Sequence, residues 1–426
     1  MAEYMKATRV AAPRQAIKKR PQRAAYDEQS EEETSQAHER SPKRAKYGLK
    51  IYDGPIDIVF FAIVIVLLGY GIIMMFSASY VAGLNLDPPD GYRYVKTQGF
   101  AAVVGVILMI IISFWDYHVL MNSKIVIFGF AFTIALMLLC FAPEPLGHAE
   151  AGAHRWINIA GQSFQPSELM KAVLIVFVAL LMCNNSDRLN EKRFYVPLTL
   201  LIGFVCALMV VQRHLSGTII MGVIAMVVVF IGGMKMKTIL KMLAILAVGG
   251  SAVLVIYAST RETGLSYIFD RFSGMGQASE GEITAESWQT AQSLIAIGSG
   301  GWFGLGFGES RQKYAWLPES QNDFIFPIIV EELGYLGGIV VVILFALFIY
   351  RGFYIAKKAR DKFGMLIVAG MTFQIGFQAL LNIGVACNAF PNTGISLPFF
   401  SYGGTALLLQ LAEMGIILAV SRQCEI

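Results

Sequence analysis

The sequence predicts an all-α polytopic membrane protein with ten transmembrane helices and one large extracytoplasmic loop between spans seven and eight. Three observations support this fold class. The chain of 426 residues is 56% hydrophobic and only 15% charged, with a mean hydropathy of +0.58, which is too apolar for an ordinary soluble domain. Apolar runs of about 20 residues, the length that crosses a bilayer once, recur along the chain. Basic residues gather in alternate connections between these runs, as in cytoplasmic loops.

The N-terminal segment differs from the rest of the chain. Residues 1–50 hold many Lys and Arg, an acidic cluster at Glu31, Glu32 and Glu33, and almost no large aliphatic residues. Such a segment buries too little apolar surface to fold, and it has no apolar stretch typical of a secretory signal peptide. We therefore expect a disordered, solvated cytoplasmic tail over 1–50, with contact to anionic lipid or a cytoplasmic partner as the alternative, and a ten-span membrane domain over 51–426.

The apolar runs and the basic residues between them give the expected topology. The runs lie near 56–80, 99–115, 124–142, 167–183, 196–211, 216–233, 238–258, 324–350, 363–386 and 402–421. Placing the tail inside also places inside the basic connections near 188–193, 235–237 and 351–362, so both termini are expected in the cytoplasm. The connection 259–323 then lies outside. It is longer than a bare connection needs, and its tryptophans predict an ordered loop at the membrane surface or the mouth of the bundle.

The five cysteines add no chemistry to this picture. They lie mostly in or beside apolar runs, at positions 140, 183, 206, 387 and 424, and show no paired spacing. The sequence therefore predicts neither a disulfide framework nor a cysteine metal site.

A carboxylate stands where a polar loop meets an apolar helix. The stretch Glu309–Gly334 passes through Asp323 and then enters an apolar run that itself contains Glu331 and Glu332. Charges in a membrane helix are costly unless they face a cavity or a partner. Asp323 is therefore a candidate functional carboxylate, while capping of the helix that follows is an equally good explanation on spacing alone.

Two more segments are expected on the same side of the membrane. In HRWINIAGQSFQPSELMK, which ends at Lys171, a proline opens a helix, and Glu168 and Lys171 share one helical face with Arg155 upstream. This pattern favours a polar cavity over a structural ion pair. In FPNTGISLPFFSYGGT, residues 390–405, prolines, glycines and hydroxyls indicate non-helical backbone at membrane depth, which is tolerated only where it lines protein or water. Its N–H and hydroxyl groups suit an anion, although a tight structural turn explains the composition equally well.

Together the three segments predict an outward-facing polar cavity with a carboxylate, cations and hydrogen-bond donors. A base and a cationic clamp without a thiol or a Ser–His pair indicate transfer from a phosphate-linked donor rather than acyl hydrolysis. A transporter of an anionic substrate would present much the same pattern.

The motifs resemble those of the SEDS family (shape, elongation, division and sporulation proteins). The matching segments are HRWINIAGQSFQPSELMK, then QSLIAIGSGGWFGLGFGESRQKYAWLPESQNDFIFPIIVEELGYLGG, then PNTGISLPFFSYGGTALLLQLAEMGIILAVSR. The resemblance runs from about residue 55 to the end. GESRQKYAWLPES and HLSGT are more similar to the FtsW and SpoVE branch than to RodA. One departure is His214, which stands where many members carry an acidic residue.

The resemblance implies a peptidoglycan glycosyltransferase, an inverting enzyme that uses lipid II as donor and acceptor. It implies that Asp323 is the catalytic carboxylate. The positions that it implies for binding lipid II, its pyrophosphate or the cavity wall are Arg155, Gln165, Glu168, Lys171, Glu319, Thr393 and Ser401. A carboxylate at the cavity mouth can accept the proton of the attacking sugar hydroxyl. Arg155, Lys171 or a divalent cation, Mg or Mn, would stabilise the leaving pyrophosphate, with the metal ligands unassigned.

The resemblance also implies partners and a location. The expected partners are lipid II, undecaprenyl-pyrophosphate-linked glycan, a class B penicillin-binding protein acting as transpeptidase, other divisome proteins and membrane lipid, with no nucleic acid. The expected location is the bacterial cytoplasmic membrane at the division septum. The alternatives are a RodA-like elongation polymerase, a lipid II flippase, which would need a polar path to the inner face, and a non-catalytic scaffold, which would not need Asp323.

Overall fold

The computed structural model describes residues 54–424 except 145, 151–152, 160–161, 261–286, 315 and 393. The predicted tail over 1–50 lies outside the described residues, and Leu49–Ile426 form one compact unit. Each predicted apolar run overlaps one helix. These helices are α2 (Ile58–Leu84), α3 (Arg93–Ser113), α4 (Ser123–Leu139), α5 (Pro166–Asn184), α6 (Lys192–Val211), α7 (Leu215–Ile231), α8 (Met236–Thr260), α11 (Ile325–Lys358), α12 (Lys362–Ala386) and α13 (Gly404–Ser421).

Eight helices in the described part of the chain are long and apolar enough to cross a membrane. The other two apolar helices, α4 and α7, are shorter, with 17 residues each. A mostly helical polytopic membrane protein is therefore confirmed, because eight apolar helices of this length match the hydrocarbon core of a bilayer.

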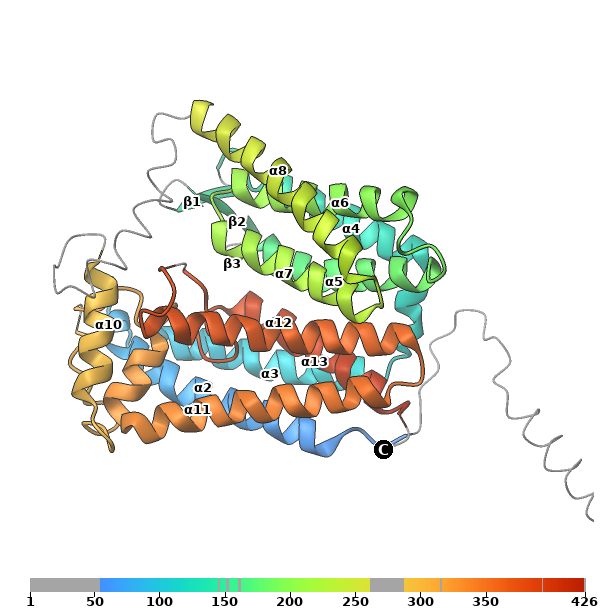
Figure 1. The fold of residues 1–426 in the computed structure, drawn as a ribbon. Helices are drawn as coiled ribbons and strands as arrows, with labels where there is room; N and C mark the ends of the chain where they lie inside the picture. The colour runs from blue at the N-terminus through green and yellow to red at the C-terminus, as the bar shows by residue number, and fades with distance from the viewer. Residues whose placement is uncertain are drawn as a thin grey trace, which may run out of the picture. The chain divides into compact units, whose positions relative to one another are not determined.

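The helices form two groups that meet at α12 (Figure 1). In one group α2, α3, α11 and α13 pack against one another, and in the other α4, α5, α6, α7 and α8 do so. Helix α12 contacts α11 and α13 on one side and α5 and α7 on the other. Among the eight long helices, α12 has the largest share of buried residues in its apolar stretch, 72%, whereas α8 has the smallest, 17%. Side chains on α12 can therefore reach residues of both groups.

The connection between α4 and α5 folds differently from the prediction. The predicted apolar runs 124–142 and 167–183 leave this region as a loop, but the structure has a three-stranded antiparallel sheet in the order β1 (Gly147–Glu150), β2 (Ala153–Ile159), β3 (Gln162–Phe164). Ile157, the central residue of the sheet, pairs with Gly147 on one side and Phe164 on the other. It is fully buried, so burial of this side chain explains the sheet. The all-α prediction is wrong in this detail.

The long connection before α11 is described over 287–324 except 315, while residues 261–286 of the predicted ordered loop lie outside the described residues. It contains the helix α10 (Trp288–Ser299), which packs against α11. A short 3₁₀ helix, η1 (Tyr117–Met121), joins α3 to α4.

Helix α11 is broken at Gly334, a feature that the single predicted run over 324–350 does not contain. Gly334 has a φ of 71°. The loop 301–306 supplies the backbone partners that a continuous helix would supply itself. Leu305 N–H donates to the carbonyl of Glu331 at 2.9 Å, and Tyr335 N–H donates to the carbonyl of Gly301 at 2.8 Å. Non-helical backbone at membrane depth is stable only with such partners.

Two glycines make this contact possible. A Cβ atom added to Gly304 would lie 2.1 Å from the carbonyl oxygen of Glu332, and one added to Gly334 would lie 2.3 Å from the carbonyl oxygen of Trp302. Both glycines also have positive φ angles, at which side chains are strained.

Charged side chains contact one another at the end of the bundle near Arg351. Arg351 Nη2 lies 2.8 Å from Asp57 Oδ2, and the Asp57 side chain also caps α2 by accepting from Phe60 N–H at 2.9 Å. In the neighbouring connections His118 Nδ1 lies 2.7 Å from Asp116 Oδ1, and His118 Nε2 lies 3.2 Å from Asp361 Oδ2. These contacts join the start of α2 to α11, and the α3–α4 connection to the α11–α12 connection.

The break in α11 leads to a stability prediction. We expect Gly334→Ala or Gly304→Ala to lower the free energy of unfolding by about 3 kcal/mol, because each adds left-handed strain and a backbone clash. The measurement is the thermal midpoint of the full chain in detergent. Gly69→Ala is the matched control, because a Cβ there meets nothing within 4 Å, and alanine is favoured within a helix. Equal midpoints for all variants would contradict the described contact.

The His118 contacts lead to a pH prediction. The hydrogen bond to Asp361 raises the pKa of His118 above its ordinary value of 6.5, although burial opposes the shift. A raised pKa gives stability that is fully present below pH 6.5 and is lost as pH rises through the raised value. We expect the wild type to lose at most about 1 kcal/mol on that rise, because the imidazole is partly exposed. The thermal midpoint of His118→Gln, measured over the same pH range, should not show this fall with rising pH. Identical dependences of the midpoint on pH in the variant and the wild type would contradict the prediction.

Candidate active site

A row of amides on α12 joins the segments that the sequence analysis expected to converge. Gln374, Gln378 and Asn382 are spaced four residues apart, so they lie on one face of the helix. All three are buried, with at most 2% of each side chain exposed. Buried amides in a membrane helix require partners. The three amides, called here the amide row, contact two neighbouring helices and two irregular segments.

Gln378 holds the predicted ion pair. Lys171 Nζ donates to Gln378 Oε1 at 2.8 Å and to Glu168 Oε2 at 2.9 Å. Only 5% of the Lys171 side chain and 12% of the Glu168 side chain are exposed. Gln378 Nε2 in turn donates to the carbonyl of Ser396 at 3.0 Å. The ammonium of Lys171 is therefore fixed beside the connection between α12 and α13.

Asn382 joins the same connection to Asp323. Its Nδ2 donates to the carbonyl of Asp323 at 2.7 Å and to the carbonyl of Ile395 at 2.6 Å. A Cβ added to Gly394, whose φ is 64°, would lie 3.3 Å from Asp323 Oδ2. The half-buried carboxylate of Asp323 therefore lies against the backbone of the α12–α13 connection. The N-cap residue of α11 is Phe324, one position after Asp323.

Ser401 provides a second link between these segments. Its hydroxyl donates to the carbonyl of Asn322 at 2.6 Å and accepts from Leu397 N–H at 2.7 Å. The neighbouring Tyr402 N–H donates to the carbonyl of Gln321 at 2.9 Å. Ser401 thus orders the backbone on which Asp323 stands, and its predicted contact with substrate stays a prediction.

Gln374 completes the amide row deeper in the bundle. Its Nε2 donates to both oxygens of Glu413, at 3.1 and 3.0 Å. Glu413, on α13, has 2% of its side chain exposed. A buried carboxyl group therefore lies one helical turn away from the level of Gln378 and Lys171.

The remaining predicted site residues occupy other positions. Glu319 is exposed, has a φ of 57°, and accepts from Asn322 Nδ2 at 2.6 Å. Gln165 is the N-cap residue of α5 and does not cap the helix with its side chain. Arg155, on β2, donates to the carbonyl of Arg213, so within the described residues its hydrogen bond leads to the turn before α7. Thr393 lies outside the described residues.

The described residues contain no group of three or more His, Cys, Asp or Glu side chains that could hold a metal ion. Mg²⁺ is commonly held by one or two carboxylates together with substrate phosphates. The carboxylates present here fit that arrangement only with a phosphate-bearing substrate.

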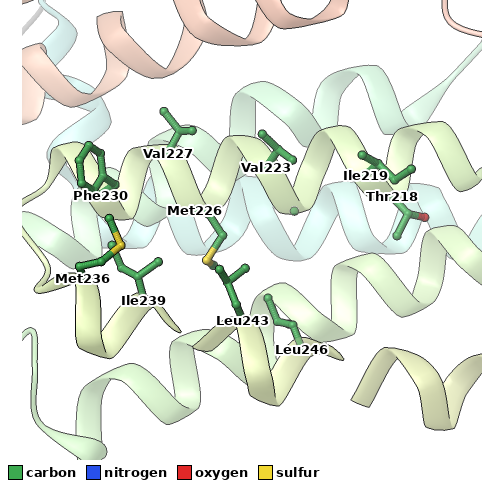
Figure 2. A pocket seen from close by; sticks show the side chains of 11 residues that line it. Thr218, Ile219, Val223, Met226, Val227, Phe230, Met236, Ile239, Leu243 and Leu246 are labelled. Atoms are coloured by element: carbon green, nitrogen blue, oxygen red, sulfur yellow. The ribbon is translucent and has the colours of Figure 1, made fainter. Parts of the chain in front are cut away.

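An apolar groove lies between α7 and α8 (Figure 2). Its volume is about 450 Å³, and its lining includes Thr218, Met226, Phe230 and Leu246. Figure 2 shows Phe230 at one end and Thr218 at the other, with aliphatic and methionine side chains between them. Such a surface fits a hydrocarbon chain.

A comparison with known protein families identifies the chain. The FtsW/RodA/SpoVE family, whose description is "Cell cycle protein", matches residues 58–426. The chain belongs to this family. The resemblance to SEDS proteins drawn from the motifs is thereby confirmed.

Curated members of the FtsW/RodA/SpoVE family match most of the chain. The probable peptidoglycan glycosyltransferase FtsW of Geobacter sp. (strain M18) is 33% identical over 366 residues, which cover 86% of this chain and 96% of that protein. The stage V sporulation protein E of Bacillus subtilis is 35% identical over 370 residues, which cover 86% of this chain and 97% of that protein.

Two solved structures have a fold similar to that of this chain. A chain from the structure described as "Structural coordination of polymerization and crosslinking by a peptidoglycan synthase complex" has a TM-score of 0.68 at 22% identity, and the match covers 86% of this chain and 98% of that one. RodA of Thermus thermophilus has a TM-score of 0.59 at 24% identity over 87% of this chain and 98% of that one.

The buried ion pair leads to a prediction. We expect Lys171→Met to lower the free energy of unfolding by about 3 kcal/mol, because it leaves the Glu168 carboxylate buried without its partner. The double variant Lys171→Met, Glu168→Leu should recover most of that loss, since no uncompensated charge remains. Thermal midpoints of the three chains in detergent test this. A double variant less stable than Lys171→Met would contradict it.

Proposed function

We propose that this chain is a peptidoglycan glycosyltransferase that polymerises lipid II into glycan strands. The observation that carries the proposal is the amide row, which joins the Asp323 backbone, the α12–α13 connection and the Lys171 ammonium in one site. Family membership supports it, because curated relatives are named probable peptidoglycan glycosyltransferases.

In the proposed mechanism Asp323 is the general base. It accepts the proton of the acceptor sugar hydroxyl as that oxygen attacks the anomeric carbon of the donor. A single displacement inverts the configuration at that carbon. Two features support this role: the carboxylate is half-buried, and Asn382 fixes the backbone that carries it. A base held in one position needs little reorganisation when the hydroxyl approaches.

Lys171 stabilises the leaving group. The donor loses a lipid-linked pyrophosphate, whose negative charge grows as the bond between its oxygen and the anomeric carbon breaks. The ammonium is held by Glu168 and Gln378, so it is oriented before substrate arrives. Arg155, Gln165, Glu319, Thr393 and Ser401 remain proposed substrate contacts. Mg²⁺ or Mn²⁺, bound by pyrophosphate oxygens and one carboxylate of the cavity, would supply further positive charge there. The apolar groove between α7 and α8 has the lining that a polyprenyl chain needs.

The proposed topology has ten spans with both termini in the cytoplasm. It adds α4 and α7 to the eight longer helices as shorter spans. Basic residues support the orientation, because Arg351, Lys357 and Lys358 lie at one end of α11 and Asp323 precedes its other end. Asp323 then faces the outer surface, together with the connection 259–323.

The proposed partner is a class B penicillin-binding protein, and the proposed location is the division septum. One chain of similar fold comes from a peptidoglycan synthase complex, and several curated relatives are FtsW proteins. Lipid II, the nascent glycan, other divisome proteins and membrane lipid are the further proposed partners.

Polymerisation is favoured over flipping because two carboxylates of α11 are already bound within the protein. Glu331 accepts from Ser310 Oγ and from Arg311 N–H. Glu332 accepts from Lys313 Nζ at 2.9 Å and from Ser77 Oγ at 2.7 Å. A polar path across the membrane would require such groups to face an open channel.

The test is synthesis of glycan strands from purified lipid II by the full chain with its cognate transpeptidase. We expect Asp323→Asn to reduce polymerisation at least 100-fold, of the order that loss of a general base costs. Asp187→Asn, an exposed position between α5 and α6, is the matched control and should retain activity. Equal products from all three chains would remove Asp323 from the mechanism. No strands from the wild type, combined with lipid II crossing a liposome bilayer, would favour the transporter.

A further inference from the structure

The loop Gly301–Gly308, called here the aromatic loop, exposes large apolar side chains beside the break in α11. Trp302 is 66% exposed, Phe303 82% and Phe307 51%. Half of the residues of the loop are glycines, at positions 301, 304, 306 and 308. Single exposed apolar residues need no explanation, but a cluster on one short loop marks a surface that meets an apolar medium or partner.

The backbone of the aromatic loop is held firmly. Gly306 N–H donates to the carbonyl of Glu332 at 3.0 Å, and Leu336 N–H donates to the carbonyl of Trp302 at 3.4 Å. The Trp302 ring packs edge-on against Tyr335 with ring centroids 5.9 Å apart. The aromatic side chains are therefore presented from a fixed position relative to α11.

The exposed stripe of α11 locates this position relative to a bilayer. From Tyr335 to Phe353 the exposed face of α11 is continuously apolar; it includes Leu336, Ile339, Val340, Val342, Ile343, Leu347 and Tyr350. At 1.5 Å per residue this stripe is about 27 Å long, close to the thickness of a bilayer's hydrocarbon core. A tyrosine stands near each end of the stripe, where interfacial aromatic residues are enriched. The aromatic loop contacts the end that lies away from Arg351.

We propose that the aromatic loop inserts Trp302, Phe303 and Phe307 among the lipids at the membrane–water interface of the leaflet at this end of α11. The occupant is phospholipid at the level of its glycerol and carbonyl groups, because the patch continues the exposed apolar stripe of α11 at its boundary. Aromatic rings are favoured at that level. The loop therefore anchors the start of α11 at a fixed depth.

The anchor has a consequence for Asp323, which rests on the proposed function. The same segment of α11, from Ile325 to Leu333, joins Asp323 to the residues that bind the aromatic loop. A fixed depth for this segment sets the height of the carboxylate relative to the lipid headgroups. A lipid-linked pyrophosphate lies at that level.

Fluorescence quenching tests the anchor without any measurement of activity. The full chain, with Trp302 retained and its other four tryptophans changed to Phe, is reconstituted in phosphatidylcholine vesicles. We expect lipids brominated near the carbonyl group to quench Trp302 about twofold more than lipids brominated near the chain end, as for an interfacial ring. In the same background Trp302→Phe with Ile343→Trp, in the middle of the stripe, should show the reverse order.

Two outcomes would overturn the proposal. Quenching of Trp302 by aqueous iodide but by neither brominated lipid would place the loop in water. Quenching by none of the three reagents would mean that protein covers the loop. If the single-tryptophan chain does not fold, photocrosslinking of the wild type answers the same question. A lipid with a diazirine near its carbonyl group should label residues 301–308, and no label there would contradict the anchor. Both experiments are independent of whether Asp323 is catalytic.

Discussion

Every backbone break at membrane depth must find hydrogen bonds inside the protein, and this constraint shapes the described bundle. Two breaks lie close to the candidate site: the interruption of α11 at Gly334 and the α12–α13 connection. Backbone of the loop 301–306 satisfies the first. Buried amides satisfy much of the second, through Asn382, Gln378 and, from α3, Gln98, which donates to the carbonyl of Ser401 at 3.1 Å. The polar groups that this constraint requires are the ones that order Asp323 and Lys171.

Three charged side chains of the described bundle also have partners inside the protein. Lys171, Lys313 and Arg351 each contact a carboxylate at 2.8 to 2.9 Å. Each pair also has neutral neighbours that complete its hydrogen bonding, which a buried ion pair needs to be tolerated. Asp323 lies beside these pairs: its side chain is half-buried, and its backbone carbonyl accepts from Asn382 Nδ2 at 2.7 Å.

Much of this architecture was predictable from sequence, because hydropathy and bilayer thickness determine where long apolar helices lie. The Glu168–Lys171 pair was predictable from helical spacing. The amide row was missed, since three amides in a long apolar run barely change its hydropathy; their four-residue spacing was the signal available. The break at Gly334 was missed because a glycine in an apolar run is compatible with either a helix or a bend. The sheet at 147–164 was missed because its strands are short, with at most seven residues each.

The reciprocal contact of Gly304 and Gly334 also constrains how this chain can change over time. A side chain at either position meets backbone of the other segment, so no compensating replacement at the partner glycine makes room for it. The two positions cannot be substituted independently. A larger residue at one cannot be offset by a smaller residue at the other, as happens between facing side chains in a core. They are retained together, or they are lost together with the break that they make possible. A lineage that straightened α11 would have to redesign the loop before Asp323 at the same time.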